Sequence, residues 1–148
     1  MKKFINIAIT LILIFSFVGC NQYTRDNTSG SITEINLDEA LTIAKEESET
    51  ILLFTLSTCK DCKKMKEVLT PYLENHSVEI NEVILDKEGT ADEEVQNNRR
   101  KINTVFEDFN SVPSMYYLKD GEIIDEIFEI TEEEQLEEWV VKNKLDKK

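Results

Sequence analysis

The sequence predicts an α/β domain in which helices cover both faces of a central mixed sheet. Three features carry this prediction. Residues 51–56 form an unbroken apolar run, which is typical of a central strand that is buried on both faces. Segments with helical periodicity alternate with the early strands, as expected for parallel strands joined by crossover helices. Asp120-Gly121 near the C-terminus indicates a tight hairpin, so the last two strands should be antiparallel.

Two helices are expected to flank the apolar strand. Asn36 and Glu39 have the spacing of a capping box, and apolar residues follow at helical intervals, which predicts a first helix over residues 37–49. A second helix should begin near Cys59 and be bent or ended by Pro71. The apolar positions on one face of this second helix are Met65, Val68, Leu69, Tyr72 and Leu73.

The middle of the chain predicts one more strand and one more helical segment. Residues 78–85 have the composition of a strand. Thr90 and Glu93 have capping-box spacing and predict the start of a helix. An apolar helical stripe follows, formed by Ile102, Val105, Phe106 and Phe109.

The C-terminal part predicts a hairpin followed by a helix. Residues 115–118 and 123–130 are the expected strands on the two sides of the Asp-Gly turn. Thr131 and Glu134 have the capping-box spacing that marks the start of a terminal helix. The inward face of that helix is expected to be formed by Leu136, Trp139 and Val140.

Residues 1–19 predict a bacterial lipoprotein signal peptide. A short basic start precedes an apolar stretch over residues 4–18, which is shorter than the roughly 20 residues of a membrane-spanning helix. The stretch ends in Gly19-Cys20 and resembles a lipobox, in which a small residue precedes a cysteine that is lipidated and becomes the mature N-terminus. Phe17 departs from that pattern, which usually has Leu there. An ordinary signal or an uncleaved anchor, with a spare thiol, is the alternative.

The remaining chain divides into a tether and a domain. Residues 20–31 are polar and are expected to form a flexible tether, which leaves residues 32–148 for one domain with one core. Without the two lysines of the signal, 15 basic residues face 30 acidic ones, a formal charge of −15. Such a surface repels nucleic acid and anionic lipid headgroups. No nucleic-acid partner is therefore expected, and a lipid on Cys20 would provide the membrane attachment.

Cys59 and Cys62 are the residues best suited to chemistry. Cys59 is expected at the start of the second helix, where unpaired N–H groups and the positive end of the helix dipole favour a thiolate. Cys59 should therefore attack disulfides, and Cys62, one turn further on, should resolve the mixed disulfide. Lys60 and Lys63 favour the thiolate further, whereas Asp61 opposes it.

Other uses of a CxxC pair need to be weighed against redox exchange. Such pairs also occur in metal sites and in structural disulfides. A tetrahedral zinc site needs four ligands, but the chain has three cysteines and one histidine, His76. A zinc ribbon within one chain is therefore not expected. A copper or zinc role of Cys59 and Cys62, and a static disulfide between them, remain the alternatives.

Over about residues 32–145 the chain resembles the thioredoxin family. The resemblance rests on Cys-Lys-Asp-Cys after a buried strand, on Val112-Pro113 before the next strand, and on the Lys-Asp-Gly-Glu hairpin. It implies a thioredoxin-like fold and a cis bond before Pro113, which lies against the active-site disulfide. It also implies that backbone groups of Val112 pair with the substrate chain. No organic cofactor and no metal are implied.

The surroundings of the cysteines depart from the usual thioredoxin pattern. Thr58 stands where thioredoxins usually have Trp, and Lys60-Asp61 replace the usual Gly-Pro. Leu53 stands where many members have a buried acid that serves proton transfer, so a water or another group would have to move that proton. The Ser-Thr-Cys-x-Asp-Cys run and the charged segment over residues 88–110 look like the bacteriocin transport accessory branch of thioredoxin-like proteins.

The function expected from the sequence is that of an extracytoplasmic thiol-disulfide oxidoreductase, anchored to the cell membrane by a lipid on Cys20. Its partners would be thiols and disulfides of proteins or peptides, together with a membrane electron-donor protein. The alternative is a binding or accessory module for a transporter or a secreted peptide, with a structural disulfide; Leu53 and Thr58 favour it. The direction of exchange, reduction or oxidation, is left open by Lys60-Asp61.

Overall fold

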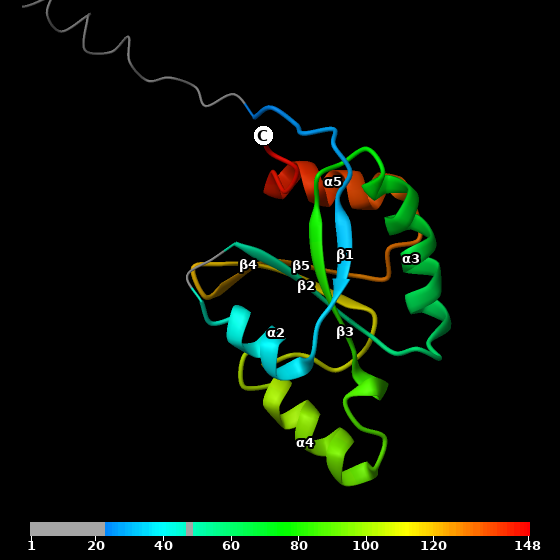
Figure 1. The fold of residues 1–148 in the computed structure, drawn as a ribbon, viewed down its shortest axis with the longest axis vertical. Helices are drawn as coiled ribbons and strands as arrows, with labels where there is room; N and C mark the ends of the chain where they lie inside the picture. The colour runs from blue at the N-terminus through cyan, green and yellow to red at the C-terminus, as the bar shows by residue number, and fades with distance from the viewer. Residues whose placement is uncertain (1–22, 47–48) are drawn as a thin grey trace, which may run out of the picture.

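The computed structural model describes residues 23–46 and 49–148, so the predicted signal peptide and Cys20 lie outside the described residues. The strands are β1 (Ser31–Glu34), β2 (Thr50–Thr55), β3 (Glu79–Ile84), β4 (Ser114–Lys119) and β5 (Glu122–Phe128). They form one sheet in the order β1-β3-β2-β4-β5 (Figure 1). The pairs β1–β3 and β3–β2 are parallel, whereas β2–β4 and β4–β5 are antiparallel. The predicted mixed sheet is therefore confirmed.

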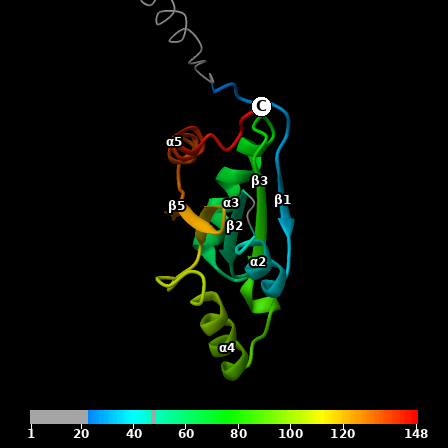
Figure 2. The ribbon, with the colours of Figure 1, turned by 90° about the vertical axis from the view of Figure 1, so that its left-hand side faces the viewer.

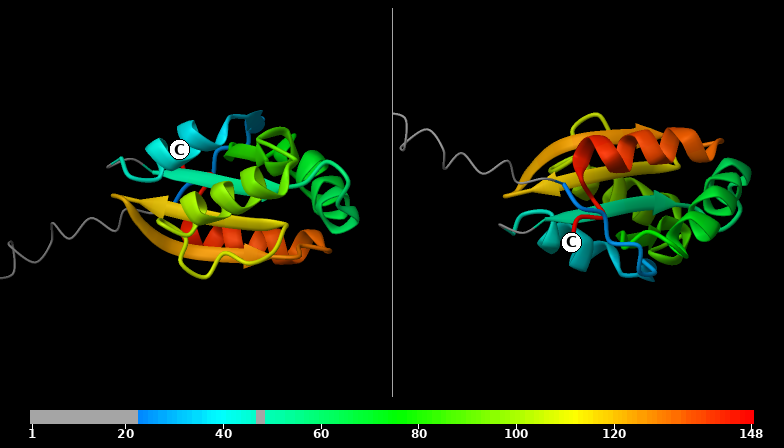
Figure 3. Two further views of the ribbon diagram at one scale, coloured as in Figure 1. Left: turned by 90° about the horizontal axis from the view of Figure 1, so that it is seen from below. Right: turned by 90° about the horizontal axis from the view of Figure 1, so that it is seen from above.

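Helices cover both faces of this sheet, which confirms the predicted fold class. The helices are α2 (Leu37–Ile43), α3 (Lys60–Leu73), α4 (Asp92–Ile102) and α5 (Glu133–Asn143), and a short 3₁₀ turn, η2 (Leu85–Lys87), follows β3. Figure 3 shows α2 and α5 on opposite sides of the strands, and Figure 2 shows α4 at one end of the molecule. In the described ranges no helix combines the length and apolar character needed to cross a membrane.

The central strand β2 contributes to a hydrophobic core on each side of the sheet. Leu53 packs with Met65 of α3 and with residues of α5, whereas Leu52 and Phe54 pack with α2 and with the chain that follows α4. All six residues of β2 are buried. The unbroken apolar run in the sequence therefore results from burial on both faces.

The end of the first predicted helix differs from the prediction, whereas the start of the second agrees with it. Asn36 caps α2 as expected, with its Oδ1 accepting the N–H of Glu39 at 2.8 Å. The helix ends at Ile43 and not at residue 49, because residues 45–49 offer no apolar side chain to bury. The helix α3 begins after Cys59, as predicted, and continues for two residues past Pro71.

The later capping boxes are each displaced by one residue. At α4, Glu94 and not Glu93 accepts the backbone N–H groups that precede the helix. At α5, Gln135 and not Glu134 does so. Because α4 ends at Ile102, the rest of the predicted apolar stripe lies in turns after the helix, although Phe106 and Phe109 are still buried.

Residues 23–31, expected to belong to a flexible tether, are bonded to the domain. The guanidinium of Arg25 donates to Asp146 at 2.7 Å, to Glu137 at 2.8 Å and to the Tyr72 hydroxyl at 3.0 Å. Asp146 is fully buried, so this charge is compensated inside the protein. This segment has few apolar side chains, but it still packs against the domain because charged groups supply the contacts. The tether prediction is therefore wrong for residues 23–31.

Candidate active site: the Cys59–Cys62 pair

Cys59 is the N-cap of α3. Its backbone is extended, with φ −72° and ψ 123°, and its Sγ accepts the N–H of Cys62 at 3.0 Å. A Ser or Asp oxygen usually accepts this bond at the start of a helix. Because the sulfur takes that place, it faces the N–H groups and the positive dipole end of the first turn, which stabilise a thiolate. The structure thus confirms the helix-start position predicted for Cys59.

The two cysteines form a disulfide and differ in exposure. Their Cα atoms are 5.3 Å apart, within the usual range for a disulfide. Cys59 is partly exposed, whereas Cys62 is only 2% exposed. An incoming partner therefore reaches the sulfur of Cys59 first. Within the part of the chain that is described, no group of three or more His, Cys, Asp or Glu side chains is placed to hold a metal ion.

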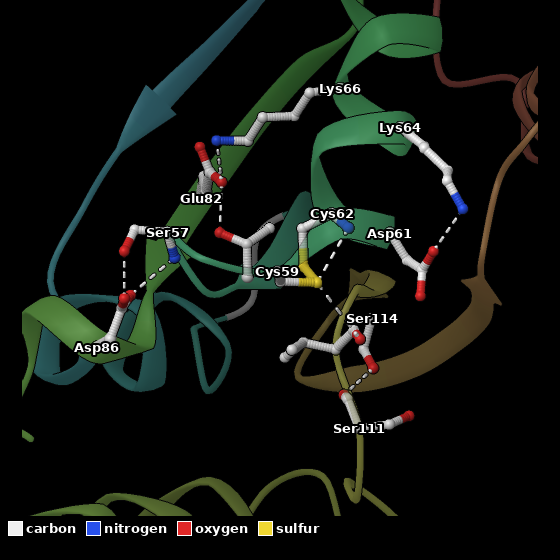
Figure 4. Close-up of a disulfide and its surroundings, with 12 residues drawn as sticks. Ser57, Cys59, Asp61, Cys62, Lys64, Lys66, Glu82, Asp86, Ser111 and Ser114 are labelled. Atoms are coloured by element: carbon white, nitrogen blue, oxygen red, sulfur yellow. Dashed lines mark hydrogen bonds and ion pairs between the residues drawn. A yellow bond between two sulfur atoms is a disulfide. The ribbon is translucent and has the colours of Figure 1, made fainter.

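The loop before β4 lies against this disulfide. The Val112–Pro113 peptide bond is cis, which confirms that prediction. The carbonyl oxygen of Val112 is 4.0 Å from the Sγ of Cys59. Ser114 donates its hydroxyl to the carbonyl of Ser111 at 2.6 Å and so closes the loop on itself (Figure 4). The loop therefore holds a backbone acceptor beside the exposed sulfur.

The other predicted flanking residues lie at the surface. Thr58, Lys60 and Asp61 are exposed. The carboxylate of Asp61 forms an ion pair with Lys64 at 2.8 Å, and this hydrogen bond raises the pKa of Lys64. The negative charge expected to oppose the thiolate is thus partly balanced by a cation one turn further along α3.

Asp86 anchors the loop before Cys59 and was not singled out from the sequence. Its carboxylate accepts the N–H of Ser57 at 2.9 Å and also the Ser57 hydroxyl. These two bonds, the hydroxyl bond first, lower the pKa of Asp86. They tie the end of β2 to η2. The available signal was an acid immediately after a predicted strand.

Glu82 is a second residue that sequence reasoning missed. It is 4% exposed and lies in the middle of β3. Thr55 donates its hydroxyl to Oε1 of Glu82 at 2.6 Å, and the Nζ of Lys66 is 2.6 Å from the same oxygen. The available signal was positional, because Ile80 and Glu82 lie on the same face of β3 and Ile80 is a core residue.

A cavity of about 420 Å³ lies beside the loop before β4, which carries the cis-proline Pro113 and is called the cis-proline loop below. It is mostly apolar and is bounded by η2, by α4 and by the chain on either side of them. Its main apolar lining residues are Leu56, Leu85, Val95, Ile102, Phe109 and Val112. The charged segment over residues 88–110 therefore forms one wall of this cavity, which lies next to the loop that carries Pro113.

Comparison with known proteins agrees with this fold. The profile of a family described as a thioredoxin-like domain matches residues 37–144. Among solved structures, the thioredoxin Mala s 13 of Malassezia sympodialis is 16% identical, with a TM-score of 0.58 over 79% of this chain and 94% of that chain. Thioredoxin F from spinach chloroplast is 19% identical, with a TM-score of 0.56 over 79% and 96%.

Mitochondrial thioredoxin 3 from Saccharomyces cerevisiae, in its oxidized form, is 23% identical, with a TM-score of 0.51 over 75% of this chain and 94% of that chain. A comparison with curated proteins found no match. At these identities the solved structures establish the fold alone, whereas the family profile spans nearly all of the domain. The chain belongs to the thioredoxin-like domain family.

Proposed function

We propose that this protein is a thiol-disulfide oxidoreductase that acts on protein or peptide substrates outside the cytoplasmic membrane. The observation that carries the proposal is the placement of Cys59. Cys59 is partly exposed, and its sulfur caps α3 and lies 4.0 Å from the carbonyl oxygen of Val112, which precedes the cis-proline. A reactive sulfur and a backbone acceptor for an extended chain are therefore available on one surface.

The first step is attack by the Cys59 thiolate on a substrate disulfide. A bond forms between Sγ of Cys59 and one substrate sulfur, and the substrate S–S bond breaks. The electron pair leaves on the second substrate sulfur, which takes a proton from solvent. Backbone groups of Val112 pair with the substrate chain and hold it beside the sulfur of Cys59. A side chain beside the substrate cysteine would then lie over the apolar cavity next to the loop.

The second step is resolution by Cys62. Its thiolate attacks Sγ of Cys59, the bond from Cys59 to the substrate breaks, and the substrate leaves as a thiolate. The product is the Cys59–Cys62 disulfide that the structure contains. The reverse exchange oxidises the substrate. The direction depends on the two reduction potentials, because the partner with the lower potential is the one that is oxidised.

The proposal includes a lipid anchor on Cys20, which lies outside the described residues. It rests on the basic start, the apolar stretch over residues 4–18 and the Gly19-Cys20 junction. Anchoring would keep the disulfide close to membrane electron donors and to newly exported chains. Cys20→Ala should abolish fatty-acid labelling and release the protein from the membrane fraction, while Cys59→Ala should leave both unchanged. Labelling that persists in Cys20→Ala would contradict this part of the proposal.

Turnover of insulin disulfides, with dithiothreitol as electron donor, tests the activity. Cys59→Ser should abolish turnover, because no attacking sulfur remains. Cys62→Ser should instead accumulate a mixed disulfide that can be isolated with the substrate. Cys20→Ser is the matched control, since it removes a cysteine outside the proposed site and should leave turnover unchanged. Wild-type turnover in Cys59→Ser would refute the assignment.

A further inference from the structure

The described N-terminal segment docks at the end of α3 that is opposite to the disulfide. Arg25 donates to the hydroxyl of Tyr72, in the last turn of α3, at 3.0 Å. The N–H of Gly30 donates to the carbonyl of Leu73, the last residue of that helix, at 2.8 Å. Cys59 instead precedes the first residue of α3. Because α3 has 14 residues, its two ends are about 21 Å apart. Figure 1 shows the segment beside α5 at the top of the molecule, from where α3 runs downwards.

Backbone hydrogen bonds fasten this segment to the C-terminal residues. The N–H of Asp26 donates to the carbonyl of Asp146 at 2.6 Å, and the N–H of Lys148 donates to the carbonyl of Thr24 at 2.9 Å. The guanidinium of Arg25 also donates to the carboxylate of Asp146, at 2.7 Å. The two backbone bonds do not depend on any one side chain. The segment is therefore held against the domain from its first described residues onwards.

This docking leaves only a short link to the proposed lipid. Cys20 is three positions before Tyr23, where the described chain begins. An extended chain spans at most about 3.6 Å per residue, so the Cα atoms of Cys20 and Tyr23 lie within about 11 Å of each other. A flexible link over all of residues 20–31 would instead let the domain turn either end towards the bilayer. A lipid on Cys20 reaches the bilayer only when the docked end is close to it.

Exposed lysines lie at the same end. Residues 142–148 include four lysines, all exposed, and the one acid among them, Asp146, is buried. Two of these lysines pair with acidic side chains, whereas Lys144 and Lys148 form no ion pair in the part of the chain that the structure describes. Lysines near an anionic bilayer are attracted to its phosphates. Charge alone does not select this end, because Lys60 and Lys63 beside the disulfide are also exposed. The position of the anchor decides between the two ends.

We propose that the end of the domain formed by residues 23–30 and 142–148 lies on the surface of an anionic membrane and that Cys59 faces away from it; this inference rests on the proposed lipid anchor at Cys20. Lys144 and Lys148 contact the lipid phosphates. The disulfide is separated from the docked end by about the length of α3. Substrates and electron donors must therefore present their cysteines on parts that extend from the membrane by a similar distance, whereas a thiol at the bilayer surface does not reach Cys59.

Lysine acetylation, read for each residue by mass spectrometry, tests the contact with lipid. The lipidated full-length protein is added to preformed vesicles of phosphatidylglycerol and phosphatidylcholine and treated briefly with a water-soluble acetylating reagent. Lys144 and Lys148 should react about fivefold more slowly than in Cys20→Ala mixed with the same vesicles, because attraction to the phosphates stabilises the unreactive ammonium form. Lys60 and Lys63 serve as internal controls, and their rates should be equal in the two proteins.

A disulfide placed at the bilayer surface tests the direction in which the site faces. The reduced anchored protein is offered a pyridyl disulfide attached to a phosphatidylethanolamine headgroup, or a soluble pyridyl disulfide. A variant with 12 Gly and Ser residues inserted between Gln22 and Tyr23 keeps the anchor but has a free link whose average span is about the length of α3. This variant should react with the lipid-linked disulfide at least about tenfold faster than the wild type. Both proteins should react equally fast with the soluble disulfide.

The outcomes separate this orientation from the proposed function. Equal acetylation of Lys144 and Lys148 in the anchored protein and in Cys20→Ala, or protection of Lys60 and Lys63 instead, would overturn the orientation. Equal rates of the wild type and the insertion variant with the lipid-linked disulfide would also overturn it. Absence of a fatty acid on Cys20 would refute the anchor and this inference with it. Failure of the wild type to react with the soluble disulfide would count against the oxidoreductase function, while acetylation would still report the orientation.

Discussion

At the scale of single residues, the sulfur of Cys59 occupies a position that a helix normally gives to oxygen. It accepts the N–H of Cys62 at 3.0 Å and therefore lies among the N–H donors of the first helical turn, which stabilise the thiolate. Asp61, two residues after Cys59, carries a negative charge that disfavours the thiolate, but its carboxylate is paired with Lys64. The balance of these charges can be measured through the reactivity of Cys59.

Asp61→Asn should speed the alkylation of reduced Cys59 near neutral pH. Removing the negative charge of Asp61 lessens its repulsion of the thiolate by up to about 1 kcal/mol, the interaction of two exposed charges a few ångströms apart, which corresponds to at most roughly a fivefold higher rate. Iodoacetamide labelling followed by mass spectrometry gives the rate for each cysteine. Glu67→Gln, at an exposed position further along α3, should have little effect. Slower labelling in Asp61→Asn would contradict this account of the site.

The sequence was sufficient to predict that Cys59 lies at a helix start and that the bond before Pro113 is cis, but not the contacts of the acids nearby. Cys59, Cys62 and Pro113 belong to short patterns that can be recognised locally. Glu82 and Asp86 accept hydrogen bonds from Thr55 and Ser57, which lie 27 and 29 positions earlier in the chain. Such contacts depend on strand register and on how β2 and β3 end, and neither can be read from a single sequence.

At the scale of elements, the order of strands β2 to β5 and of the helices was predictable, whereas the ends of these elements were less so. Burial on both faces of β2 and the Asp-Gly turn give strong local patterns. Asp120 and Gly121 do adopt positive φ values, 54° and 77°, as such a hairpin requires. The boxes at α4 and α5 were displaced by one residue, because acidic and amide side chains occur at several adjacent positions and only the backbone geometry selects one.

Gln135→Ala should lower the free energy of unfolding by about 1 kcal/mol, the usual effect of losing an N-terminal cap. The Oε1 of Gln135 accepts the backbone N–H groups of Thr131 and Glu132 at 2.9 and 3.1 Å, and these donors would lose their acceptor. Denaturant titration measures the change. Glu134→Ala, at the position predicted from the sequence, should have a smaller effect, and the opposite ranking would show that the predicted box is the one that matters.

At the scale of the whole molecule, the described N-terminal segment is fastened to the C-terminal helix. Arg25 contacts Glu137 of α5 and the buried Asp146 beyond it. The hydrogen bond from Arg25, opposed by burial and helped by the Tyr72 hydroxyl, lowers the pKa of Glu137 from 4.5 to about 2. The sequence did not reveal this docking, because a polar segment with one arginine resembles a tether until its partners are placed.

The Glu137 interaction should make the domain less stable in acid. A carboxyl whose pKa is lower in the folded than in the unfolded state contributes stability above its ordinary value of 4.5, and this is lost as the pH falls towards 2. Unfolding measured across this range should therefore show a steeper loss for the wild type than for Glu137→Gln. Equal slopes for the two proteins would show that Glu137 is not coupled to folding.

The central claim is that the Cys59–Cys62 disulfide is exchanged in function, and its reduction potential tests that claim most directly. Equilibration of the full-length protein with glutathione or dithiothreitol buffers, followed by thiol labelling, gives the value. The account predicts a potential within the range of catalytic disulfides, between about −120 and −280 mV. A potential far below about −300 mV would contradict it, because that range is typical of structural disulfides.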